Sequence, residues 1–232
     1  MKKVLIGAGL ITLFSCSKKE ERSVNAARPF NVEKQKRDSA TAPPWISNNQ
    51  EFLDKFPQII PDTLKFRAPN YDDKELGKKL TREEVQLFPN GHQLESFLGG
   101  GDFEAVGKFE LDENTFGMVA RMPGEYSFTA LQLFFYDKKK DSFLPRHFEL
   151  ADKLGDAGYS EEIRSWLFWD TNKRLTSFTH VYTSVEKVDP ADAVRPSKTN
   201  DYYMVTLTPQ KFDTVRVNAE TFAKMRPLLD RK

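Results

Sequence analysis

From residue 103 to residue 217 the chain repeats one pattern, in which short segments of alternating apolar and polar residues are separated by polar turns. In residues 103–111 (FEAVGKFEL), Phe103, Ala105 and Phe109 fall on one face of an extended chain, and charged residues fall mainly on the other. This period of two is typical of a strand with one buried face. Strands joined by tight turns pair antiparallel, so the pattern limits this part of the chain to an antiparallel meander.

Eight segments carry this pattern, and we predict strands at 103–111, 115–122, 126–136, 143–150, 162–170, 175–186, 202–207 and 213–217. Pro145 cannot donate a backbone hydrogen bond and therefore predicts an edge or a bulge in its strand. Ser160–Glu162 can alternatively cap a helix, but the aromatic residues that follow favour a strand. Residues 187–200, with two prolines, are predicted to form a long polar loop.

Helix signals lie before and after these strands. Residues 49–57 predict a short helix, and Thr81–Glu84 has the sequence of a capping box, with Leu80 and Val85 placed for a hydrophobic staple. Asn218 can cap a helix over 219–225. The predicted fold class is therefore mainly β: an antiparallel meander of about eight strands forming a sandwich or a barrel, with short N-terminal helices and a C-terminal helix.

The N-terminus has the layout of a secretory signal. Met1 is followed by two lysines, and an almost uninterrupted apolar run extends from Val4 to Phe14. This run is too short to span a bilayer, which needs about 20 apolar residues. We therefore expect residues 1–15 to be a removed signal peptide.

Leu13-Phe14-Ser15-Cys16 resembles the lipobox of bacterial lipoproteins. The resemblance implies cleavage before Cys16 and acylation of its thiol. The protein's first expected partner is therefore a membrane, to which the lipid would attach it. Residues 17–21 (SKKEE) resemble the export tag of surface lipoproteins of the Bacteroidetes group, which implies the outer membrane and surface exposure. The alternative is an ordinary secreted protein with a spare thiol.

Residues 16–45 are predicted to be the lipid anchor and a flexible tether, and 46–232 a single β-rich globular domain. Residues 17–44 contain seven basic and four acidic residues and a single aromatic residue, so they are expected to be a solvated spacer or to be attracted to anionic head groups. The whole chain has 35 basic and 34 acidic residues, and this balance gives no indication of a nucleic-acid partner.

Few residues indicate chemistry. The three histidines, His92, His147 and His180, are isolated in the sequence, and no metal-binding spacing or serine-nucleophile motif is present. Cys16 is the only cysteine, so an acylated Cys16 leaves the folded part without a thiolate ligand. The sequence therefore predicts no catalytic residue, no metal site and no cofactor.

The aromatic residues are the exception. Trp166 and Trp169 are the candidate ligand-binding residues, because alternation in a strand places Trp166 on one face and Trp169 on the other, and one face can be open. Exposed rings on a sheet would suit a glycan or an envelope protein as the partner. The alternative is that both faces are covered, one by the opposing sheet and one by the N-terminal helices.

Two functions remain as hypotheses. The first is a non-enzymatic binding or accessory module of the cell envelope, lipid-anchored to the outer membrane. The second is an envelope hydrolase whose site is assembled only in the fold, with Asp102, Glu104, His147 and His180 as the residues that can contribute. A third possibility is a structural protein that packs on another envelope component through an exposed apolar patch.

The lipobox resemblance generates a direct prediction. Cys16→Ala removes the acylated thiol, and the protein is expected to move from the membrane fraction to the soluble fraction, because each buried methylene of an acyl chain contributes about 0.8 kcal/mol to membrane binding. Fractionation of cells that express each form measures this, with Ser17→Ala as the control. Unchanged membrane retention of Cys16→Ala would refute lipid anchoring.

Overall fold

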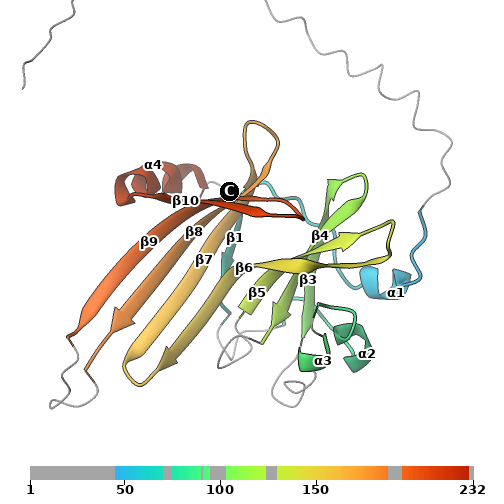
Figure 1. Ribbon diagram of the computed structural model, residues 1–232, viewed down its shortest axis with the longest axis horizontal. Coiled ribbons are helices and arrows are strands. Elements are labelled where there is room, and N and C mark those ends of the chain that lie inside the picture. The colour runs from blue at the N-terminus through green and yellow to red at the C-terminus, as the bar shows by residue number, and fades with distance from the viewer. Residues whose placement is uncertain are drawn as a thin grey trace, which may run out of the picture. The chain divides into compact units, whose positions relative to one another are not determined.

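The computed structural model describes residues 45–69, 75–89, 91–94, 103–123, 130–187 and 195–229 (Figure 1). The predicted signal peptide, Cys16 and the tether up to residue 44 lie outside the described residues, as does Asp102. The side chain of His92 also lies outside them. In the part of the chain that is described, no helix has the length and apolar character needed to cross a membrane.

The described chain is mainly β, as predicted. Its strands are β1 Leu64–Arg67, β2 Lys78–Lys79, β3 Glu104–Asp112, β4 Thr115–Met122, β5 Ala130–Asp137, β6 Ser142–Asp156, β7 Tyr159–Trp169, β8 Leu175–Val185, β9 Ser197–Leu207 and β10 Phe212–Val217. Its helices are α1 Gln50–Leu53, α2 Arg82–Val85, α3 Gly91–Leu94 and α4 Ala219–Leu229.

The sheet is an antiparallel meander in the order β10-β9-β8-β7-β6-β5-β4-β3-β2, and β1 pairs with β7 outside this order. Each of the eight predicted strands is present as one of β3–β10, whereas β1 and β2 were not predicted. The loop predicted over 187–200 is wrong at its end, because β9 already begins at Ser197. The sheet does not close, since β10 and β2 lie at its two ends.

Strand β6 belongs to both halves of the sheet. Its first part pairs with β5, and only Asp152–Asp156 pairs with β7. Between Phe143 and His147 the register with β5 shifts, so Pro145 lies in a bulge, as its missing N–H predicts. Where β6 has separated from β7, β1 pairs with residues 164–167 of β7.

The two halves of the bent sheet pack face to face around one core. Side chains of β3–β6 meet side chains of β7–β10 there, and the fully buried members include Phe109, Val119, Leu133, Phe135, Leu150 and Leu167. The Phe109 and Trp169 rings lie 6.5 Å apart, and the Phe135 and Phe212 rings lie 6.2 Å apart. The arrangement is a sandwich made by bending one sheet, and the strand alternation seen in the sequence supplies its apolar inner faces.

Helices cover the outer faces of both halves (Figure 1). The N-terminal helices pack Phe52 and Phe88 against Phe134 of β5. Thr81 and Glu84 form the predicted capping box, with Glu84 N–H donating to Thr81 Oγ1 at 3.3 Å and Thr81 N–H donating to Glu84 Oε2 at 2.6 Å. This capping box fixes the start of α2, a helix too short to form alone.

At the other end of the chain, α4 packs Phe222 and Leu229 against Trp166 and Phe178 of the outer β7–β8 face. Asn218 caps α4 as predicted, because its Oδ1 accepts the Thr221 N–H at 2.8 Å.

A buried ion pair holds the first strands of the sheet together. Arg121 Nη1 lies 3.2 Å from Glu104 Oε1, and the two residues are 7% and 2% exposed. The other carboxylate oxygen of Glu104 accepts backbone N–H groups of Leu76 and Gly77 at 2.6 and 3.2 Å. Glu104 therefore joins β3 and β4 to the segment that precedes β2.

Arg121→Met is expected to lower the free energy of unfolding by about 3 kcal/mol, because it leaves the buried Glu104 carboxylate without its cation. Adding Glu104→Gln to this variant is expected to recover part of the loss. Lys224→Met, which breaks an exposed pair with Glu220, is the control and should cost less than about 1 kcal/mol. Urea unfolding measures all three, and equal losses for Arg121→Met and Lys224→Met would contradict the assignment.

Candidate functional site

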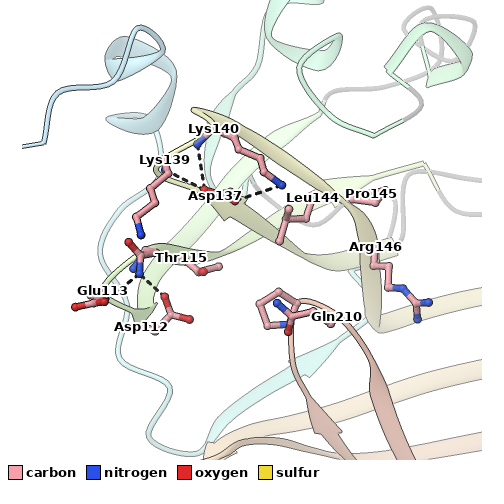
Figure 2. Close-up of a pocket in the computed structure, with 12 residues that line it drawn as sticks. Asp112, Glu113, Thr115, Asp137, Lys139, Lys140, Leu144, Pro145, Arg146 and Gln210 are labelled. Carbon is pink, nitrogen blue, oxygen red and sulfur yellow. Dashed lines mark hydrogen bonds and ion pairs between the residues drawn. The ribbon is translucent and has the colours of Figure 1, made fainter.

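Three hairpin turns meet at one end of the described sheet and surround a groove of about 790 Å³ (Figure 2). They are the turns between β3 and β4, between β5 and β6, and between β9 and β10. We call this space the hairpin groove. Its charged lining residues are Asp112, Glu113, Asp137, Lys139, Lys140 and Arg146.

The turns position these side chains through their own hydrogen bonds. Asp112 Oδ1 accepts the Asn114 N–H at 2.8 Å, an Asx-type turn that reverses the chain after β3. Asp137 Oδ1 accepts the N–H groups of Lys139 and Lys140 at 2.9 and 3.1 Å. Both turns were predicted from the sequence, and in both the aspartate that forms the turn also lines the groove.

The bulge in β6 supplies a further wall of the groove. Leu144, Pro145 and Arg146 all line it, although regular alternation would turn every second side chain away. The register shift between Phe143 and His147 removes this alternation. Pro209 and Gln210, from the β9–β10 turn, line the groove from the other half of the sheet.

The cations of the groove are largely unpaired. Among the described residues, Lys139 and Arg146 have neither an ion pair nor a side-chain hydrogen bond. Lys140 Nζ lies 3.8 Å from Asp137 Oδ2, which is beyond hydrogen-bond distance, and its side chain is 69% exposed. Lys139 and Arg146 therefore have no protein partner to exchange for a ligand, although a ligand must still displace water from them.

The first residues of the described unit are fixed beside this groove by a set of contacts that we call the N-terminal clasp: Trp45, Ser47, Asn49, Tyr136 and Asp141. Trp45 Nε1 donates to the Lys138 carbonyl at 2.7 Å. Ser47 Oγ and the Tyr136 hydroxyl both donate to Asp141 Oδ1, at 2.5 and 2.8 Å. Asn49 Nδ2 donates to the Tyr136 hydroxyl at 3.0 Å.

Asp141 is the centre of the clasp and closes the turn between β5 and β6. Burial would raise the pKa of its carboxyl group, but hydrogen bonds donated by Ser47, Tyr136 and Asn48 outweigh burial and lower the pKa. Burial raises the pKa of Tyr136, so its hydroxyl remains a donor at neutral pH. Asp141 has a φ of 54°, a left-handed conformation that aspartate adopts more readily than most residues.

A second group of carboxylates, Glu149, Asp152 and Glu161, lies on β6 and β7, away from the groove. Burial, together with the nearby negative charges of Asp152 and Glu161, raises the pKa of Glu149 to about 7. Within the described ranges, no cluster of three or more Asp, Glu, His or Cys side chains is placed to hold a metal ion.

The structure does not bring the two predicted aromatic site residues together. Trp166 is 3% exposed and packs beneath α4, with its ring 5.9 Å from that of Phe222. Trp169 is partly buried on the opposite face, against Phe109 of the shared core. Both faces of this strand are therefore covered, as the alternative expected, but α4 covers the outer face instead of the predicted N-terminal helices.

The residues considered for a hydrolase lie on three different faces. Glu104 is used in its buried ion pair with Arg121. His147 lies beside Phe134, on the face of β5 that the N-terminal helices cover. His180 stacks on Tyr202 on the outer face of β8, and its Nε2 is 2.8 Å from Asn200 Oδ1. These side chains do not converge on one site.

Comparisons of this chain with protein-family models, with curated proteins and with solved structures found no match. The sequence identified each turn of the hairpin groove but not the groove itself, because only the bend in the sheet brings the β9–β10 turn close to the other two.

Glu149 generates a prediction about pH. Its pKa is raised from an ordinary value of 4.5 to about 7, so the folded protein binds this proton more tightly than the unfolded chain does. Its contribution to stability is fully present below pH 4.5 and is lost as the pH rises to about 7. Glu149→Gln is therefore expected to be more stable than the wild type at pH 8 and equally stable at pH 4. The difference at pH 8 is expected to be on the order of 1–2 kcal/mol, because water screens this partly exposed group.

Urea unfolding of both proteins at the two pH values measures this difference. Glu220→Gln, at an exposed position of α4, is the control and should change the free energy of unfolding by less than about 1 kcal/mol at either pH. A Glu149→Gln effect of the same size at both pH values would show that the carboxyl group does not titrate in this window.

Proposed function

We propose that this protein is a binding module of the bacterial cell envelope, lipid-anchored to the outer membrane through Cys16, and that its ligand lies in the hairpin groove. The observation that carries the proposal is the set of charged side chains around this groove, with Lys139 and Arg146 unpaired among the described residues. An isolated surface charge contributes little to the stability of the fold, so folding does not explain these side chains. They remain available to bind a ligand.

The anchor is supported by the sequence of residues 1–16 and by its resemblance to a lipobox. The N-terminal clasp adds a geometric argument, since Trp45 is held against the same turn that carries Lys139 and Lys140. Trp45, the first described residue, is therefore fixed beside the groove. A glycan or an envelope protein is the partner expected for such a module.

The described groove favours binding over catalysis. Asp112 and Asp137 each accept backbone hydrogen bonds within their turns, which fixes the carboxylates in place and uses part of their hydrogen-bonding capacity. The hydrolase hypothesis needs two of Asp102, Glu104, His147 and His180 to converge, and the three of these that the structure describes lie on different faces. No described observation favours that second hypothesis.

The proposal is tested with a double variant of the full chain, Lys139→Gln with Arg146→Gln, in detergent. A panel of oligosaccharides, peptides and purified envelope components is screened for binding to the wild type. Any ligand found is expected to bind the double variant at least tenfold more weakly, because a hydrogen bond to a charged group contributes about 1.5–3 kcal/mol.

Lys198→Gln with Lys224→Gln is the matched control, because it removes the same charge from exposed positions outside the groove. It is expected to change affinity less than about twofold. Equal effects of the two double variants, or no binding by the wild type to any member of the panel, would refute the groove as the ligand site.

A further inference from the structure

We infer that the ligand of the hairpin groove is a short extended peptide segment that carries both positive and negative side chains. This inference rests on the proposed function and names the class of partner that the groove selects. It follows from the distribution of charge, from the hydrogen-bonding groups and from the shape of the walls.

The charges of the groove are balanced in sign, and one carboxylate, Asp137, lies on the same turn as Lys139 and Lys140. Three carboxylates and three cations line it, so neither sign dominates. Figure 2 shows Asp112 and Glu113 on one side and Arg146 on the opposite side. A ligand with charges of one sign would meet repulsion on one wall, whereas a ligand with both signs can match the two sides, as complementary protein surfaces do.

The uncharged polar groups of the groove suit a peptide backbone. Asn114 and Gln210 carry amide groups, which donate and accept hydrogen bonds as a peptide backbone does. Thr115 adds a hydroxyl group with the same double capacity. The side chains of Leu144, Pro145 and Pro209 give the groove apolar surface for a ligand's aliphatic side chains.

The size of the groove sets the length of the segment. A volume of about 790 Å³ lies within the range of roughly 300–1,000 Å³ that holds a small ligand, and this corresponds to a few peptide residues. The groove is bordered by hairpin turns and by the part of β6 where its register with β5 shifts, so it has no regular strand edge for a ligand to extend. The segment is therefore bound through its side chains and a few backbone groups, without adding a full strand to the sheet.

A sugar is the less suitable ligand. No aromatic side chain is among the described residues that line the groove, so it offers no ring on which the face of a sugar can stack. Trp166, the candidate platform in the sequence, is buried under α4. The carboxylates Asp112, Glu113 and Asp137 would also repel a polyanion.

The test uses synthetic decapeptides of equal length: one with an acidic block and a basic block, one acidic, one basic and one uncharged. Neutral and acidic oligosaccharides complete the panel. The wild-type full chain is expected to bind the peptide with both charges at least tenfold more tightly than any other member, measured by calorimetry. Raising the salt concentration is expected to reduce this preference.

Two double variants test which lining residues contact the positive part of the peptide and which contact the negative part. Asp112→Asn with Glu113→Gln removes the negative wall while an oxygen at 112 still accepts the Asn114 N–H. This variant is expected to lose at least fivefold in affinity for the peptide with both charges and to bind the acidic peptide more tightly than the wild type does. Lys139→Gln with Arg146→Gln is expected to show the opposite change, with improved binding of the basic peptide.

The outcomes separate this inference from the proposed function. Preferential binding of an oligosaccharide, or of a peptide of one charge, that is lost in the groove variants would overturn the inference and leave the groove as the ligand site. Binding that is unchanged in both pairs of variants, or no binding of any member, would overturn both. Circular dichroism melts of each variant confirm that a lost affinity is not a lost fold.

Discussion

The arrangement of this protein depends on one strand, β6, that changes partner along its length. It leaves β5 and joins β7 within a single continuous strand, and register shifts with β5 near Pro145 and Leu150 interrupt the regular ladder. A straight β6 would hold all strands in one open layer, with the apolar inner faces of both halves exposed to water. Bending at β6 lets these faces bury each other, which is the largest favourable contribution to stability that a chain of this composition has.

The sequence predicts most of the fold because strand alternation and turn residues are local signals. The positions of β3–β10, the capping box at Thr81 and the cap at Asn218 follow from such signals. The strands β1 and β2 were missed because they are short and depend on partners distant in the chain. The end of β6 and the start of β9 were missed because Asp152–Asp156 and Ser197–Asp201 are polar, and only their pairing makes them strands.

The candidate site was less predictable than the fold, and the reason is physical. Each turn of the hairpin groove is recognisable in the sequence, but a groove exists only where turns from different halves meet. Trp166 and Trp169 drew attention because they are large and close in sequence, yet packing by α4 and by the shared core explains them. Exposed Lys139 and Arg146 resemble ordinary surface residues, and no local pattern distinguishes them.

The N-terminal clasp also has a mechanical consequence. A pulling force transmitted through the chain before Trp45 reaches the body first at the hydrogen bond from Trp45 to the Lys138 carbonyl, and then at the contact between Ser47 and Asp141. Asp141 closes the turn that carries Lys139 and Lys140, so the hydrogen bonds that resist this load also set the spacing of one wall of the groove. A load on the chain before Trp45 would therefore be carried by the same turn that holds two of the cations of the groove.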